Sequence, residues 1–214
     1  MAERAYIMPI ALRLWHWTNA LLMILLIISG ASLHFTDPVI PLIRFDIART
    51  IHNVSGIGVS VLYIFFAVWN SATGSWRQYI PELKGLKANL DRQNYYVFVG
   101  QLKGDAPHVV PTPEQKFNAM QQLTYIGVMY IAMPVVIVTG LAFFYPELAP
   151  AQLFGFDGLL PIAVLHYVAG FGLTMFLLGH LYMGTTGTTV AGGFRMMITG
   201  WHDEHDEKPE NEQP

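Results

Sequence analysis

The sequence predicts an all-α integral membrane protein, a four-helix bundle with both termini in the cytoplasm. The first observation is composition. Of the 214 residues, 53% are hydrophobic and only 13% are charged, with a mean hydropathy of +0.38, which is too apolar for an ordinary soluble domain. The second is that the charges leave four long stretches empty. The third is an unequal distribution of Lys and Arg between these stretches.

The four stretches without Asp, Glu, Lys or Arg separate Arg13 from Asp37, Arg49 from Arg77, Lys116 from Glu147, and Asp157 from Arg195. Each is long enough to hold the roughly 20 apolar residues with which a helix crosses about 30 Å of hydrocarbon. We therefore expect helices at residues 12–33, 49–70, 120–144 and 161–184.

The rest of the chain predicts little further structure. Residues 1–214 are expected to form a single domain, in which the loop at 71–117 holds a short strand or an interfacial helix. The acidic residues 201–214 are expected to form a flexible cytoplasmic tail. A cleavable signal peptide is not expected, because the first apolar run is too long and lacks a small-residue cleavage site.

Orientation follows from the basic residues. If the N-terminus, the middle loop and the tail share one side, that side carries ten of the twelve Lys and Arg residues, and the other side carries only Arg44 and Arg49. The positive-inside rule then places both termini in the cytoplasm. All five tryptophans also fall near this inner interface, where amphipathic rings prefer to lie.

Histidine is the residue type on which any metal chemistry must depend. The chain has no cysteine, which excludes disulfides, thiolate zinc sites, iron–sulfur clusters held by this chain and covalent c-type haem. Four histidines lie within the predicted spans and sort by depth into two level pairs. His52 and His166 lie near the outer face, and His16 and His180 near the inner face.

The spacing of His166 and His180 supports this sorting. Fourteen residues of helix rise about 21 Å, and fourteen steps of about 100° return to within about 40° of the starting direction. Both rings therefore face the same side of one helix. This pattern suits two haems at different depths in a four-helix bundle, each held by one ligand from the fourth helix and one from a neighbour.

Other interpretations compete with this one. A single intramembrane histidine is often a helix–helix hydrogen-bond donor, and the chain would then be a haem-free membrane anchor. A small transporter subunit is a further alternative, since Pro134 could break the third helix, although the spans contain no Asp or Glu. Glycines within the spans permit the close approach of a porphyrin or of another helix: Gly30, Gly56, Gly140, Gly170 and Gly172.

The remaining histidines are expected to have other roles. His34 ends the first helix and competes with His52 as a ligand, but an interfacial position is the preferred interpretation. His108, His202 and His205 lie in the predicted loop and tail, where a solvated histidine is the default. A metal site in the acidic tail is the less favoured alternative for the last two.

The segment LRLWHW around His16, the position of His52, the segment KFNAMQQ and the His166/His180 pair resemble one family. It is the dihaem cytochrome b membrane subunit of respiratory formate dehydrogenases, nickel–iron hydrogenases and thiosulfate reductases. The resemblance covers essentially all four helices. It implies an outer, periplasmic haem on His52 and His166 and an inner, cytoplasmic haem on His16 and His180.

The resemblance also implies a quinone site beside the inner haem. The asparagine of KFNAMQQ, Asn118, is the matching quinone residue, and Gln121, His180 and Arg13 complete the expected set. The competing role for Asn118 is a helix cap, and that for Arg13 is a snorkelling anchor. The family segment has Gly at the position of Met120 and Lys at the position of Gln122, and a larger Met would reshape the quinone pocket.

The implied cofactors are two non-covalent, bis-histidine b-type haems, with menaquinone or ubiquinone as exchangeable substrate. The implied partners are a periplasmic iron–sulfur or other redox subunit and a catalytic subunit, with no nucleic acid. The expected location is the inner (cytoplasmic) membrane of a bacterium or archaeon, as a multi-pass protein in the lipid bilayer. The direction of electron flow stays open.

Overall fold

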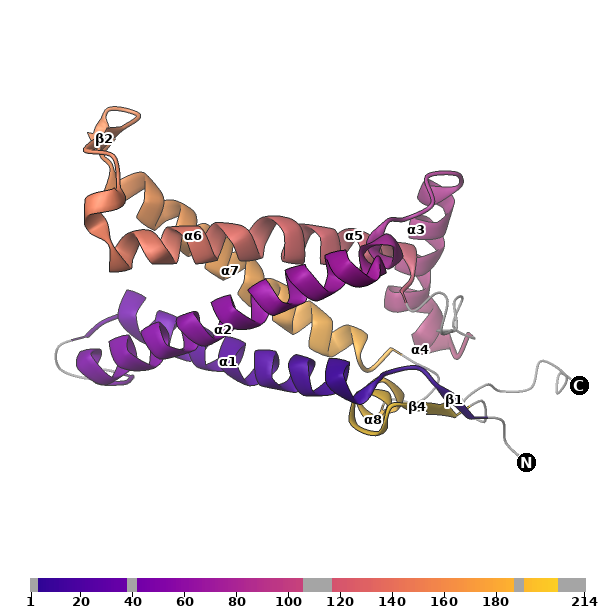
Figure 1. Cartoon of the computed structure of the whole chain (residues 1–214). Helices are drawn as coiled ribbons and strands as arrows, with labels where there is room; N and C mark the ends of the chain where they lie inside the picture. Colours follow the sequence, from indigo (N-terminus) through magenta and orange to yellow (C-terminus); the bar gives the residue numbers. More distant parts are fainter. Residues whose placement is uncertain (1–3, 38–41, 106–116, 187–190, 204–214) are drawn as a thin grey trace, which may run out of the picture. The chain divides into compact units, whose positions relative to one another are not determined.

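The computed structural model describes residues 4–37, 42–105, 117–186 and 191–203. In this part of the chain four helices are long and apolar enough to cross a membrane. They are α1 (Ile10–His34), α2 (Phe45–Thr73), the helix Ala119–Phe144, which contains α5 and α6, and α7 (Leu159–Met183) (Figure 1). The predicted all-α fold with four spans is confirmed, and every helix end lies within four residues of its expected position.

The contacts divide the chain into two compact units. Unit 1 contains Met1–Leu14, Ser75–Ile126 and Phe176–Pro214, and unit 2 contains Trp15–Gly74 and Gly127–Met175. Each unit is described by itself below. The expectation of a single domain over residues 1–214 stays a prediction.

The core of unit 2 is an apolar cluster built from all four long helices. Its buried members are Val59 on α2, Met133 on α6 and Leu173 on α7, each no more than 4% exposed, and α1 adds Leu22 and Leu26. The opposite helix faces carry exposed large apolar side chains. Since hydrocarbon is the solvent there, such faces are expected to contact lipid.

The third span is not a uniform α-helix. It consists of α5 (Ala119–Tyr125), a π-helical segment η3 (Ile126–Ala132) and α6 (Met133–Phe144), with Pro134 in the first turn of α6. Proline lacks an N–H and its ring clashes with the carbonyl four residues earlier, so the preceding turns widen. Pro134 therefore changes the helix locally, and the span continues as one helix.

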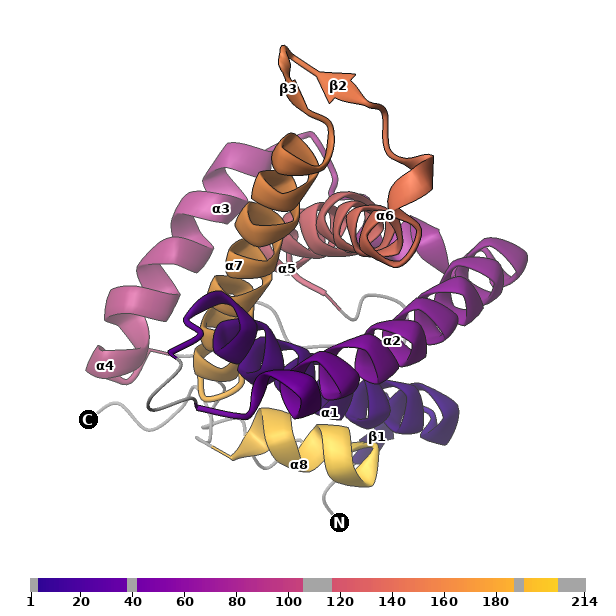
Figure 2. The same ribbon diagram turned by 90° about the vertical axis from the view of Figure 1, so that its left-hand side faces the viewer.

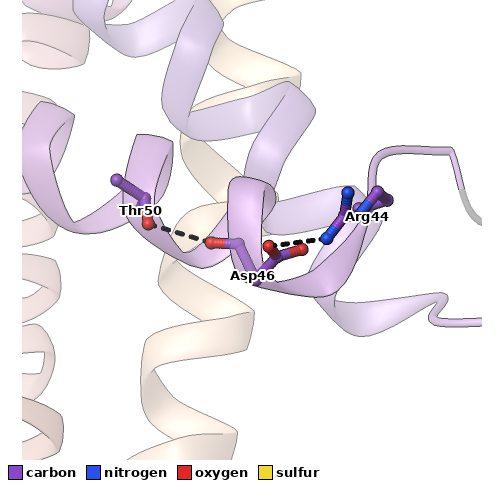
Figure 3. A network of polar contacts seen from close by, with 3 residues as sticks. All are labelled: Arg44, Asp46 and Thr50. Atoms are coloured by element: carbon purple, nitrogen blue, oxygen red, sulfur yellow. Dashed lines mark hydrogen bonds and ion pairs between the residues drawn. The ribbon is translucent and has the colours of Figure 1, made fainter.

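Short polar contacts fix the connections within unit 2. The hydroxyl of buried Ser32 on α1 hydrogen bonds both the N–H and the carbonyl of Ile43, each at 3.0 Å. At the start of α2, Arg44 pairs with Asp46 at 3.0 Å, and Thr50 donates to the Asp46 carbonyl (Figure 3). The Arg44–Asp46 pair is largely exposed and contributes little stability.

A small hairpin joins α6 to α7. It follows the turn η4 (Pro146–Leu148) and pairs β2 (Gln152–Leu153) with β3 (Phe156–Asp157) in antiparallel register. Figure 2 shows it beyond the adjoining ends of α6 and α7. Its two turn residues, Phe154 and Gly155, both have positive φ angles, of 55° and 83°.

The described part of the middle loop, residues 75–105 in unit 1, consists mainly of short helical segments and contains no strand. Of the two expected alternatives, a strand or a helix, the structure has helices. They are η1 (Ser75–Tyr79), α3 (Leu86–Tyr95), the π-helical η2 (Tyr96–Gly100) and α4 (Gln101–Lys103).

This segment caps the end of α7. The Tyr96 hydroxyl donates to the Thr186 carbonyl at 3.0 Å, and Gln101 donates to the Thr185 carbonyl at 2.9 Å. Burial, together with Asp105, raises the pKa of Tyr96, so its hydroxyl keeps the proton that it donates.

The two ends of the described chain pair in unit 1. β1 (Arg4–Tyr6) is antiparallel to β4 (Trp201–Asp203), which follows α8 (Gly192–Thr199) (Figure 1). Both ends therefore lie on one side, as four spans require, and which side is cytoplasmic stays a prediction. Trp201–Asp203 form β4, and residues 204–214 lie outside the described residues. The expectation of a flexible cytoplasmic tail at 201–214 stays a prediction.

We expect Leu173→Ala to destabilise the bundle, because Leu173 is 4% exposed in the core of unit 2. Truncating a buried leucine costs about 2–5 kcal/mol when the cavity does not collapse. Thermal unfolding in detergent measures the effect. Leu178→Ala is the matched control on the same helix, since Leu178 is 58% exposed. Equal melting temperatures for the two variants would contradict the assigned core.

Candidate functional site

The structure brings together His52 of α2 and His166 of α7. Both rings are half-buried in unit 2, with centroids 6.2 Å apart and planes inclined at 69°. The sequence placed these two histidines at one depth, and in the structure they face each other. Whether they bind a metal stays a prediction.

The separation of the rings fits one iron atom between them. An imidazole nitrogen binds a metal ion at about 2 Å and lies about 1 Å from its own ring centroid, so two rings on opposite sides of one iron have centroids about 6 Å apart. In the described part of the chain, no group of three or more His, Cys, Asp or Glu side chains forms a metal site. A two-imidazole donor set suits iron whose other positions a macrocycle fills.

A serine–glycine pair on α1 faces His52. Ser29 is fully buried, and its Oγ lies 3.1 Å from His52 Nδ1. A Cβ atom built on Gly30 would stand 3.2 Å from Cε1 of the same ring, which is a tight contact. The absence of a side chain at Gly30 therefore leaves the space that the imidazole occupies.

A threonine–glycine pair on α6 faces His166 in the same way. Thr139 is buried, and its Oγ1 lies 2.8 Å from His166 Nδ1. A Cβ atom on Gly140 would stand 3.4 Å from His166 Cε1. Sequence reasoning noted Gly30 and Gly140 but missed both hydroxyls. The available signal was that each glycine directly follows a small hydroxyl residue.

The other two intramembrane histidines fall in different units. His16 belongs to unit 2, where its ring meets the edge of Trp17 at 5.3 Å, and His180 belongs to unit 1, where Phe176 stacks on its ring at 5.5 Å. Their pairing therefore stays a prediction.

An aromatic cluster of Tyr79, Phe117, Tyr125 and Phe176 adjoins His180 in unit 1. Phe117 meets Tyr125 at 5.0 Å between centroids, Tyr125 meets Phe176 at 6.4 Å, and Phe176 stacks on His180. Tyr79 packs on both Phe117 and Tyr125. Continuous ring contacts thus run from the residue next to Asn118 to His180.

Asn118 caps the start of α5, which is one of the two roles expected for it; the other is contact with quinone. Its Oδ1 accepts from the Gln121 N–H at 2.9 Å, and Gln121 Oε1 accepts from the Asn118 N–H at 3.0 Å, a reciprocal capping box at the start of α5. Capping uses the carbonyl oxygen of each side chain. Each side-chain amide still has its NH₂ group as a donor.

Two neighbouring residues hold short elements in place. Buried Gln122 donates to the Gln78 carbonyl at 2.8 Å and so binds η1 to α5. The Arg13 guanidinium donates to the Ile198 carbonyl near the end of α8, where a cation is favoured by the helix dipole.

The remaining histidines lie elsewhere. The ring of exposed His34 stacks on Tyr167 at 4.2 Å. His202 lies in β4, and His108 and His205 lie outside the described residues.

Comparison with known proteins assigns the chain to a family. The family model of prokaryotic cytochrome b561 matches residues 7–200. The Escherichia coli (strain K12) protein named "Putative cytochrome YdhU" is 32% identical over 200 residues, covering 94% of this chain and 75% of that protein. No solved structure gives a significant match. The chain belongs to the prokaryotic cytochrome b561 family, and this membership implies a b-type haem and electron transfer in a prokaryotic membrane.

We expect Gly30→Val and Gly140→Val to weaken haem binding, because each new side chain would occupy the space of the facing imidazole. Losses around metal ligands are typically about tenfold or more in affinity. A pyridine haemochrome assay measures haem b per chain. Gly127→Val is the control, since a Cβ at Gly127 on the third span meets nothing within 4 Å. Normal haem content in both test variants would contradict this role.

Proposed function

We propose that this prokaryotic cytochrome b561 protein is the membrane-anchoring dihaem cytochrome b subunit of a respiratory oxidoreductase complex. In this proposal it relays electrons between a periplasmic-side redox partner and a membrane quinone near the cytoplasmic face. The observation that carries the proposal is the His52–His166 pair, with ring centroids 6.2 Å apart.

In the proposal His52 and His166 hold the outer haem, and His16 and His180 hold the inner one. When bound, each bis-histidine b-type haem supplies one-electron transfer and has no open coordination position for oxygen or substrate. Support for the second level comes from α7, which runs unbroken from Leu159 to Met183 and so keeps His166 and His180 about 21 Å apart along the helix.

The apolar core of unit 2 adjoins the outer histidine pair of the same unit. Leu173, which is 4% exposed in that core, stands seven residues after His166 on α7. Val59 stands seven residues after His52 on α2 and belongs to the same cluster. Seven residues of helix rise about 10.5 Å. An apolar cluster of this kind keeps water out of the interior next to the outer pair.

The proposed quinone site lies in unit 1. Asn118 and Gln121 each keep an amide NH₂ group, which suits donation to quinone carbonyl oxygens. The aromatic cluster supplies ring faces against which a quinone ring can pack, and it ends at His180. Among the expected quinone residues Arg13 has the least support, because its guanidinium donates to the Ile198 carbonyl.

The proposed reaction exchanges two electrons and two protons with menaquinone or ubiquinone. Protons pass to or from the cytoplasm, whose side the distribution of Lys and Arg indicates. The proposed partners are a periplasmic iron–sulfur or other redox subunit and a catalytic subunit. The partner sets the direction: a hydrogenase or formate dehydrogenase makes the chain a quinone reductase, and a terminal reductase makes it a quinol oxidase. A haem-free anchor or a transporter subunit is disfavoured by the family membership.

The first test is a dithionite-reduced minus oxidised visible spectrum of the purified protein, with a pyridine haemochrome count. The proposal requires two low-spin b haems per chain. Folded protein that was made with haem available and carries none would overturn it, and a single haem would remove the second level.

We expect His52→Ala to remove the outer haem, and His180→Ala to remove the inner haem together with quinone-linked turnover. In the second variant the outer haem stays reducible by its redox partner or by dithionite. Spectra and quinol oxidation or quinone reduction rates measure both effects. His34→Ala is the control, because His34 is exposed and stacks on Tyr167. Retained quinone activity in His180→Ala would count against the assignment.

Asn118 allows capping to be separated from quinone binding. Asn118→Ser keeps a capping oxygen but removes the amide donor, whereas Asn118→Ala removes both and costs about 1 kcal/mol of stability. If Asn118 contacts quinone, both variants raise the KM for quinone, while Asn118→Ser keeps the wild-type melting temperature. A wild-type KM for quinone in Asn118→Ser would show that Asn118 only caps the helix and does not contact quinone.

A further inference from the structure

We infer that Ser29 and Thr139 are positioning residues, which fix the tautomer and the orientation of His52 and His166 so that each ring presents an unprotonated Nε2 to the haem iron. The inference rests on the proposed function, because it takes these two histidines as the ligands. It assigns a redox role to two buried hydroxyls that are otherwise ordinary helix residues.

The hydroxyl protons of Ser29 and Thr139 are used in hydrogen bonds within their own helices. Ser29 Oγ donates to the Leu25 carbonyl at 2.6 Å, and Thr139 Oγ1 donates to the Val135 carbonyl at 2.6 Å, each four residues back along its own helix. A hydroxyl has one proton and two acceptor sites. Towards the facing imidazole each oxygen can therefore only accept, so Nδ1 of each ring carries the proton.

A second carbonyl lies near each hydroxyl and leads to the same conclusion. Ser29 Oγ lies 3.3 Å from the Leu26 carbonyl, and Thr139 Oγ1 lies 3.3 Å from the Val136 carbonyl. A carbonyl oxygen can only accept. With either carbonyl as partner, the hydroxyl proton is therefore directed along its own helix and away from the imidazole.

A neutral imidazole has one N–H, and its other nitrogen is then a metal ligand. With the proton on Nδ1, the unprotonated nitrogen of His52 and of His166 is Nε2. The arrangement occurs twice, once between α1 and α2 and once between α6 and α7, with a glycine after each hydroxyl. Two independent occurrences of the same contacts indicate a shared role.

The consequence is measurable in the outer haem. Donation from Nδ1–H to a fixed acceptor makes the ligand more basic, which favours the oxidised iron. Ser29→Ala and Thr139→Val remove one acceptor each, so the midpoint potential of the outer haem rises. We expect a change of up to about tenfold in the ratio of oxidised to reduced haem at a fixed potential, equivalent to about 59 mV for one electron.

Matched controls exist on the ligand helices. Ser60 donates to the Gly56 carbonyl at 2.7 Å, and Thr174 donates to the Gly170 carbonyl at 2.9 Å. They stand eight residues after His52 and His166 respectively and make the same bond within the helix. Ser60→Ala and Thr174→Val therefore remove a hydroxyl of the same kind, and Thr139→Ser keeps the hydroxyl at the site itself.

The experiment is a redox titration of the purified holoprotein, followed by visible spectroscopy and by haem b content. The inference expects an upward shift of the component that His52→Ala abolishes, in Ser29→Ala and Thr139→Val only. Loss of that haem from both variants, with Thr139→Ser normal, also supports it. Unshifted potentials in both variants, equal shifts in the controls, or a Thr139→Ser variant that behaves like Thr139→Val would overturn it.

Failure of the proposed function is distinguishable from these outcomes. A wild-type titration without b-type haem, or a His52→Ala variant that keeps both components, removes the premise that His52 is a ligand. The hydroxyl inference fails by itself only when the wild type carries two haems and His52→Ala loses one.

Discussion

A ring N–H inside hydrocarbon has to find its acceptor within the protein, and this constraint organises the structure around His52 and His166. Water is not available there, and an unsatisfied polar group costs several kcal/mol. The acceptors are the small hydroxyls of Ser29 and Thr139 on the adjoining helices. Such short groups reach a ring only when the helices approach closely, which Gly30 and Gly140 permit. At this site the hydrogen bond of each imidazole therefore depends on the close packing of the two helices that it joins.

The sequence predicted what the membrane itself dictates. Hydrocarbon thickness sets the length of each span, so the charge-free stretches located all four helices, and depth alone placed His52 beside His166. It did not predict Ser29 and Thr139. Each directly precedes a glycine, but Ser55–Gly56 has the same pattern, so the position of the neighbouring helix is needed to show which hydroxyl meets a histidine. It also missed α8 and the pairing of β1 with β4, since eight residues of helix and three residues of strand give too weak a periodic signal.

The start of the third span combines a structural and a proposed chemical role in the same side chains. The capping box of Asn118 and Gln121 satisfies two N–H groups that the helix leaves without partners. The capping box uses the side-chain carbonyl oxygens of both residues. The side-chain NH₂ groups of both residues take no part in it. The asparagine of this segment was expected either to cap or to contact quinone. The geometry makes the two roles compatible, because they use different atoms of one amide.

The pairing of β1 with β4 has a consequence for biogenesis. The N-terminal strand leaves the ribosome first, but its partner at Trp201–Asp203 is made almost 200 residues later. At typical synthesis rates the first strand waits roughly 10–40 s, during which all four helices have to enter the bilayer with their correct topology. If one helix failed to insert, the two strands would lie on opposite sides of the membrane. Closure of this small sheet is therefore a late assembly step that a chain with a single uninserted helix cannot complete.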